Sequence, residues 1–217
     1  MAIRYGNSLA NTIYGTSTAD TIYGYGGNDT IYAGSGNDKA YGGTGNDRLY
    51  MSYGNDTAYG DSGHDLLSGQ SGFDLLYGGT GDDDLYGGSE DDDLYGQSGY
   101  DYLDGGTGHD YLSGGTQNDD IFGGSGNDTI VGGSGNDDLT GGSGFDDFVF
   151  FDFNGDDFIW DFQLGVDLID LTATSAANVV MNSIFAGGDW STEIDYGTGY
   201  VTVVGVDPGE LSGDVLI

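Results

Sequence analysis

Residues 123–149 decide the fold of this chain, because they read GGSGNDTIV, GGSGNDDLT and GGSGFDDFV, three units of nine residues with Gly, Asp and one apolar residue at fixed places. The same period runs back to Gly6 without insertion or deletion and gives sixteen units. Position 6 is Asp in fifteen units, position 8 is apolar in all, and position 1 is Gly in fourteen. An unbroken period of this length indicates a solenoid of repeated turns.

Each unit predicts one turn and one short strand. The apolar residue at position 8 lies between two outward positions, 7 and 9, as in a strand, and the six residues before them, rich in Gly, Asn and Asp, are typical of a turn. Two units make one coil of 18 residues, so alternate units build two parallel sheets that face each other. We therefore expect an all-β fold, a right-handed parallel β-roll of two sheets with a β-rich C-terminal cap.

The chain divides into three regions. Residues 1–23 contain degenerate units and are expected to form an N-terminal cap, and residues 24–149 are expected to form the regular roll. Large apolar residues become common after the last unit, and the stretches 148–171 and 200–206 alternate like strands. Because an open roll ends in an unpaired edge, residues 150–217 are expected to close it.

Charge and composition exclude several classes of protein. The chain has 37 acidic and 3 basic side chains, a formal charge of −34, and no Cys. Too few basic residues are present to neutralise phosphates, so we expect no nucleic-acid partner. No apolar run approaches the roughly 20 residues needed to cross a bilayer, so we expect no transmembrane segment. A chain this acidic and this poor in large apolar side chains needs cations in order to fold.

The position-6 aspartates are spaced for such a cation. Side chains 18 residues apart lie on neighbouring coils, where carboxylates repel each other unless a cation lies between them. Ca²⁺ favours six to eight oxygen ligands from carboxylates and backbone carbonyls, and glycine-rich turns expose such carbonyls. We predict about 12 to 14 Ca²⁺ ions, held along two columns of carboxylates. The predicted ligands are Asp29, Asp47, Asp65, Asp83, Asp101, Asp119 and Asp137 in one column, the Asp29 column, and Asp20, Asp38, Asp56, Asp74, Asp92, Asp110, Asp128 and Asp146 in the other, the Asp20 column.

The repeat pattern GGxGxDxUx, with U a large apolar residue, resembles the RTX (repeats-in-toxin) family of calcium-binding parallel β-rolls. Three stretches look like the C-terminal module of serralysin-type proteases: residues 156–171, DDFIWDFQLGVDLIDL, residues 201–206, VTVVGV, and residues 214–217, DVLI. In that family an uncleaved C-terminal signal directs export through a type I secretion channel. The resemblance therefore implies a secreted, extracellular bacterial protein that folds when it meets external Ca²⁺.

Catalytic motifs are missing from the sequence. It contains no HExxH pattern of zinc proteases and no GxSxG pattern of lipases. His64 and His109 both occupy position 5 on opposite edges, so we expect exposed turn residues that share no metal. Asp156, Asp157 and Asp161 break the period, and we interpret them as turn residues or ligands of an additional calcium ion. We expect a protein that is not an enzyme.

Tyrosine is the most frequent residue at position 9. Tyr23, Tyr41, Tyr59, Tyr77 and Tyr95 are each 18 residues apart, so they should stack on the outer face of one sheet. Aromatic packing between neighbouring strands explains this row. Self-association and a cell-surface or polysaccharide partner stay open as alternatives.

These observations predict a secreted, non-enzymatic, calcium-binding β-roll that folds on binding extracellular Ca²⁺ and has a structural, adhesive or surface-assembly role. Two alternatives stay open. The chain is a calcium-dependent folding and export module of a larger secreted enzyme, such as a serralysin-type protease, or it is a polysaccharide-binding module. Because carboxylates bind metal only when ionised, we expect acid to unfold the calcium form.

Overall fold

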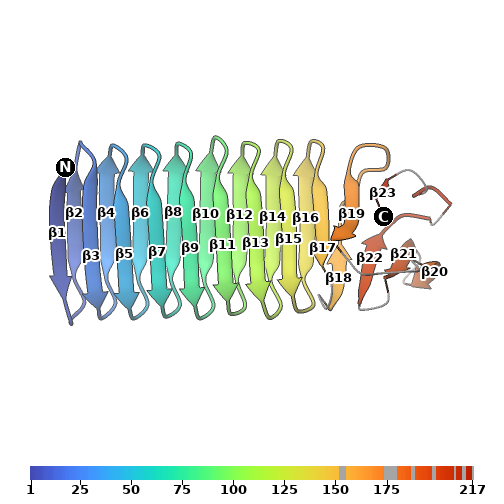
Figure 1. The fold of residues 1–217 in the computed structure, drawn as a ribbon, viewed down its shortest axis with the longest axis horizontal. Coiled ribbons are helices and arrows are strands. Elements are labelled where there is room, and N and C mark those ends of the chain that lie inside the picture. The colour runs from blue at the N-terminus through green and yellow to red at the C-terminus, as the bar shows by residue number, and fades with distance from the viewer. Residues whose placement is uncertain are drawn as a thin grey trace.

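The computed structural model of the chain is an all-β solenoid of two parallel sheets (Figure 1). It describes residues 1–151, 155–173, 180–186, 189–196, 199–207, 209–211 and 214–216. The strands are β1 (Ala2–Asn7), β2 (Thr12–Thr16), β3 (Asp20–Gly26), β4 (Thr30–Ser35), β5 (Lys39–Thr44), β6 (Arg48–Tyr53), β7 (Thr57–Ser62), β8 (Leu66–Ser71), β9 (Leu75–Thr80), β10 (Asp84–Ser89), β11 (Asp93–Ser98), β12 (Tyr102–Thr107), β13 (Tyr111–Thr116), β14 (Asp120–Ser125), β15 (Thr129–Ser134), β16 (Asp138–Ser143), β17 (Asp147–Phe151), β18 (Asp156–Ile159), β19 (Leu168–Ala173), β20 (Val180–Ala186), β21 (Asp189–Asp195), β22 (Tyr200–Val204) and β23 (Val215–Leu216).

The two sheets take alternate strands, as the nine-residue period predicts. Odd-numbered strands from β1 to β19, followed by β23, form an 11-stranded sheet, and even-numbered strands from β2 to β18, followed by β22, β21 and β20, form a 12-stranded sheet. From β1 to β17 the paired residues are 18 apart, as in Leu76 opposite Leu94, so the predicted coil length and parallel register are confirmed.

The strands are longer than the sequence predicted. In β9, the strand begins at position 7 of one unit and continues to position 3 of the next, and Gly79 and Thr80 pair with Gln97 and Ser98 of β11. The prediction that positions 1 to 6 form a turn is therefore wrong, because only positions 4 to 6 turn the chain. Glycine hides this extension in the sequence, since the pairing uses the backbone alone and needs no side chain.

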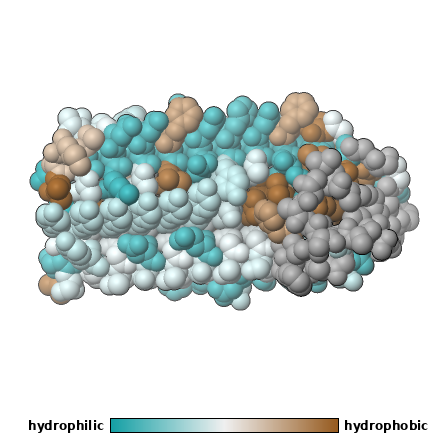
Figure 2. Space-filling model, viewed as in Figure 1, coloured by the Kyte–Doolittle hydropathy of each residue, from teal (hydrophilic) through white to brown (hydrophobic). Residues whose placement is uncertain are grey.

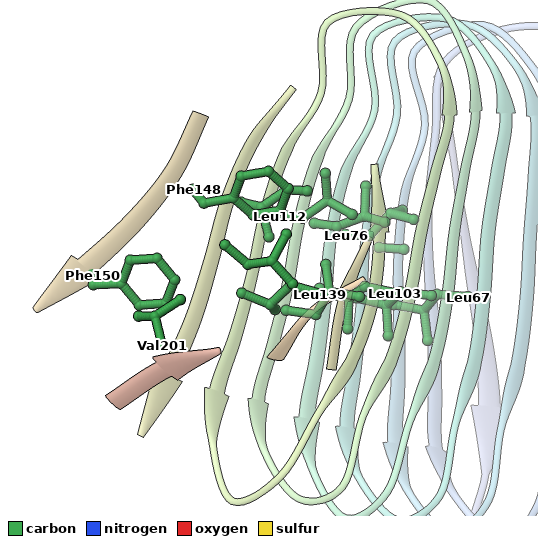
Figure 3. Packing of buried hydrophobic residues seen from close by; sticks show 14 of the residues in the cluster. Leu67, Leu76, Leu103, Leu112, Leu139, Phe148, Phe150 and Val201 are labelled. Carbon is green, nitrogen blue, oxygen red and sulfur yellow. The ribbon is translucent and has the colours of Figure 1, made fainter. Parts of the chain in front are cut away.

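The core is a single layer between the sheets. The position-8 side chains point inward from both sides, and Leu67 and Leu103 of one sheet form a file that faces Leu76 and Leu112 of the other (Figure 3). All four side chains are fully buried. A core this thin buries little apolar surface per residue, so the roll needs a further source of stability.

The turns depend on a left-handed backbone at position 4. Most units place Gly there, for example Gly126 with φ +135°, whereas Glu90 and Gln117 adopt φ +73° and +78°. Among the described residues, Leu9 and Thr18 of the first two units do not share the positive φ. The departures at Glu90 and Gln117 thus keep the turn of the other units, and those at Leu9 and Thr18 abandon it.

Gln117→Gly is expected to raise the free energy of unfolding by about 0.5 to 1 kcal/mol, because relief of the left-handed strain exceeds the entropy that Gly loses. Glu90→Gly should gain less, because Glu90 Oε2 accepts hydrogen bonds from the Gly72 N–H at 3.0 Å and the Ser89 hydroxyl at 2.9 Å. Urea unfolding at saturating calcium checks both variants. Equal gains, or losses in both, would contradict the strain argument.

The two ends of the roll differ. At the first end, the edge strands β1 and β2 leave Ile3, Tyr5 and Tyr14 exposed, and Leu9 between them is exposed as well. At the other, β22 pairs in parallel with β18, and β21 and β20 continue the 12-stranded sheet in antiparallel pairs; β22 coincides with the strand expected within 200–206. Of the C-terminal DVLI motif, the last residue lies outside the described residues. No helix in the described part of the chain is long and apolar enough to span a membrane.

Candidate metal sites along two aspartate columns

The structure brings all fifteen predicted aspartates together in the two columns. Each is at most 3% exposed. In thirteen of them the backbone N–H donates a hydrogen bond of 2.6 to 3.1 Å to Oδ1 of the column aspartate on the next coil, as Asp83 does to Asp101 at 2.8 Å. One carboxylate oxygen therefore holds the register between neighbouring coils, which leaves the other for a different task.

That second oxygen, Oδ2, is buried and has no hydrogen-bond partner among the described residues in fourteen of the fifteen aspartates. A buried anionic oxygen without compensation is costly, so a native fold pairs it with a cation or a proton. These fourteen are Asp29, Asp38, Asp47, Asp56, Asp65, Asp74, Asp83, Asp92, Asp101, Asp110, Asp119, Asp128, Asp137 and Asp146.

The surroundings of Oδ2 fit a hard cation. A Cβ added at Gly87, position 1 of its unit, would lie 2.6 Å from Asp92 Oδ2 and 2.6 Å from the Gly105 carbonyl oxygen on the next coil. Glycine therefore keeps open a space bordered by a carboxylate and a carbonyl, the oxygen ligands that Ca²⁺ prefers. Ala33 and Met51 take position 1 in two units, and both side chains are buried in the core.

Carboxylates alone do not complete a site. Within the described residues, no three side chains of His, Asp or Glu converge on one point, because each gap between coils receives the carboxylates of two neighbours only. Backbone carbonyl oxygens lie beside these carboxylates as well, since a Cβ added at Gly78 would lie 2.6 Å from Asp83 Oδ2 and 2.8 Å from the Gly96 carbonyl oxygen of the next coil. The fit to Ca²⁺ thus rests on side chain and backbone together.

Asp20 differs from the other fourteen aspartates. Its Oδ2 accepts hydrogen bonds of 2.7 Å from both the backbone N–H and the hydroxyl of Thr16. Asn11 Oδ1 accepts the Asn7 N–H at 2.8 Å in the same way. The first two units therefore satisfy their own polar atoms, as a cap does, and the role of Asp20 as a ligand stays a prediction.

The pKa values of the aspartates also separate Asp20 from the other members of the columns. Burial, with a smaller contribution from neighbouring carboxylates, raises the pKa of Asp83, Asp92 and Asp119 to about 8. The pKa of Asp20 is lowered, because the hydrogen bonds from Thr16 and Ala2 outweigh the effect of burial. Ionising the column aspartates at neutral pH therefore costs free energy, and a bound cation would offset that cost.

Position 5 carries a second ladder that sequence reasoning missed. The Asn46 N–H donates to Asn28 Oδ1 at 3.0 Å, and the Asn127 N–H donates to His109 Nδ1 at 2.7 Å. His64 and His109 are exposed and lie on opposite edges, as predicted, yet each accepts a hydrogen bond from the next coil. The signal was the frequency of Asn at this position, since Asn can bond along a stack of identical turns.

The tyrosine row stacks as predicted. From Tyr23 to Tyr95, neighbouring ring centroids are 4.9 to 5.0 Å apart with interplanar angles of 3° to 15°. The Lys39 ammonium lies 4.9 Å from the Tyr59 ring centroid. The ring faces thus cover one another, which supports packing along the sheet. Figure 2 shows one face of the rod, on which most residues are hydrophilic or near neutral and hydrophobic residues gather toward the C-terminal end.

Comparison with known proteins agrees with this geometry. A family model described as RTX calcium-binding nonapeptide repeat (4 copies) matches residues 5–40, 32–67, 41–76, 59–94, 77–112, 86–121 and 113–148. No curated protein matches the chain.

The solved structures that are similar to this chain include the following two. One is the extracellular lipase LipA from Serratia marcescens, with 18% identity and a TM-score of 0.42, over 97% of this chain and 40% of the lipase. The other is the AlgE6R3 subunit from the Azotobacter vinelandii mannuronan C5-epimerase, with 22% identity and a TM-score of 0.41, over 69% of this chain and 82% of the subunit. The chain thus spans less than half the length of the lipase.

Proposed function

Because this chain belongs to the family of RTX calcium-binding nonapeptide repeats, matched from residue 5 to residue 148, we propose that its roll folds when extracellular Ca²⁺ enters the gaps of the two aspartate columns. The repeats of this family bind Ca²⁺. The observation that carries the proposal is the run of fourteen buried Oδ2 atoms without a hydrogen-bond partner among the described residues. A thin core and buried like charges oppose folding until cations neutralise them.

The carboxylate oxygens, the glycines and the backbone carbonyls have separate roles in this proposal. Oδ1 of each column aspartate accepts a backbone N–H of the preceding coil and so holds the two coils in register, and Oδ2 offers a charged ligand to the gap. Glycine at position 1 leaves room for the ion, and the backbone carbonyls add uncharged oxygens. Calcium supplies the positive charge that lets neighbouring coils approach.

We propose a secreted, non-enzymatic protein with a structural, adhesive or surface-assembly role. Support comes from the repeats, from the serralysin-like pattern of residues 156–171 and from the sequence's lack of hydrolase motifs. A folding and export module of a larger secreted enzyme, and a polysaccharide-binding module, are the alternatives. The stacked Tyr faces weaken the case for sugar stacking on this row.

Calcium titration tests the proposal. Circular dichroism of the metal-free chain at neutral pH should show little β-structure, and added Ca²⁺ should restore it together with a more compact sedimentation profile. Mg²⁺ is the control, because its small octahedral shell fits a flexible oxygen site poorly. A chain that is fully ordered without Ca²⁺ at neutral pH would overturn the proposal.

A further inference from the structure

The repeat geometry continues beyond the last unit recognised in the sequence. Gly155 has φ +123°, as glycines at position 4 have. The Asp156 N–H donates to Asn136 Oδ1 at 3.1 Å, which is the position-5 ladder, and the Phe158 N–H donates to the Asp137 carbonyl at 2.8 Å, as position 7 does elsewhere. Residues 155–159 therefore occupy positions 4 to 8 of a further unit, displaced by two residues.

Asp157 takes position 6 of this unit. It is 0% exposed, and its Oδ1 accepts the Asp137 N–H at 3.0 Å, as between each earlier pair of neighbouring aspartates in the Asp29 column. Its Oδ2 is buried without a hydrogen-bond partner among the described residues, as is Oδ2 of Asp137. The next coil places Val201 opposite Asp157, so the column of carboxylates ends here.

The Asp20 column ends differently. Asp167 is the last carboxylate of this column, because its Oδ1 accepts the Asp146 N–H at 3.2 Å. Its Oδ2, however, accepts the Gln163 N–H at 2.7 Å, four residues earlier in the chain, as Asp20 Oδ2 accepts that of Thr16. The protein itself satisfies this carboxylate, whereas it leaves Asp157 for a cation.

We propose that Asp157 is a calcium ligand outside the nonapeptide repeats and that it shares with Asp137 the last ion of the Asp29 column. This inference rests on the proposed function. Asp137 and Asp157 supply two charged oxygens to one gap, which is the arrangement found between neighbouring repeats. The cap is thereby fixed to the roll by metal on the edge of the Asp29 column and by the hydrogen bonds of Asp167 on the other.

The test compares Asp157→Asn with Asp156→Asn in the full chain. Asparagine at 157 keeps an oxygen for the Asp137 N–H but removes the charged ligand, and Asp156 is an exposed neighbour that loses the same charge. Native mass spectrometry at saturating Ca²⁺ should find one ion fewer in Asp157→Asn and the original number in Asp156→Asn. Circular dichroism confirms that both are folded.

A second measurement uses the unmodified chain. Anomalous scattering from crystals soaked in Tb³⁺ should show a peak between Asp137 and Asp157 and none between Asp146 and Asp167. A folded Asp157→Asn chain with the original ion number, or no peak beside Asp157, would overturn this inference alone. An unmodified chain that binds no Ca²⁺ would instead overturn the proposed function.

Discussion

Asp83→Asn is expected to raise the calcium concentration at the folding midpoint, because it weakens the binding of calcium beside it by roughly tenfold, equivalent to about 1.4 kcal/mol. Asp83 stands in the middle of its column, between Asp65 and Asp101 on the two neighbouring coils, and its Oδ2 has no hydrogen-bond partner among the described residues. Asparagine retains an oxygen for the Asp65 N–H, which lies 2.7 Å from Asp83 Oδ1, so the register bond survives. The loss therefore falls on metal binding, and it is measured by calcium titration with circular dichroism.

Asp84→Asn is the matched control. Asp84 is the next residue, loses the same charge, and is exposed on the outer face of β10. Its substitution should leave the midpoint nearly unchanged, because an exposed carboxylate interacts weakly with ions at this range. Equal shifts in the two variants would mean that net charge, and not the column, governs folding. No shift in either variant would remove Asp83 from the ligand set.

The calcium-free chain is expected to gain β-structure when the pH falls from about 8 to about 5. Twelve column aspartates have pKa values raised to between about 6 and about 8, chiefly by burial. The corresponding pKa in the unfolded chain is near 3.8. Between these values the folded chain binds more protons than the unfolded one, so its free energy of unfolding falls as the pH rises.

The pH dependence has the opposite sign when calcium is bound. Ca²⁺ requires ionised carboxylates, so protons compete with it and its affinity should fall as the pH drops below about 8. Acid then removes the ion but also neutralises the buried carboxylates, which qualifies the expectation from sequence that acid simply unfolds the calcium form. In the calcium-free chain, the loss of stability from ionising the column aspartates is absent below about pH 4, where both states are protonated, and complete above about pH 8.

Circular dichroism of metal-free protein at pH 5 and pH 8 checks the first part. Calorimetry of calcium binding at pH 7 in buffers of different ionisation enthalpy checks the second, because proton release shows as a buffer-dependent heat. Asp20 serves as an internal contrast, since hydrogen bonds lower its pKa and it contributes no such release near neutral pH. A metal-free chain that is more ordered at pH 8 than at pH 5 would contradict the assignment of the columns.

The repeat predicts both columns because identical residues 18 apart must stack once the coil closes. Asp101 and Asp119, for example, lie one above the other for no reason except the period. The same logic places the Tyr row and the apolar files. The repeat pattern does not predict the length of the strands, because Gly79 pairs through its backbone and has no side chain that would indicate a strand. It fails also for Asp157, because two additional residues break the period before it.

The sequence by itself determined the parallel two-sheet roll, its coil length and the fifteen aspartates that line it, since a strict period leaves only one way to stack the units. The tertiary structure alone decided which of those carboxylates still lack a partner. Asp20 and Asp83 share a position in the repeat, yet the Thr16 backbone turns toward Asp20 and no such donor reaches Oδ2 of Asp83 within the described residues. Whether a carboxylate needs a cation depends on the hydrogen-bond donors that the folded backbone directs at it, and a period in sequence does not contain that direction.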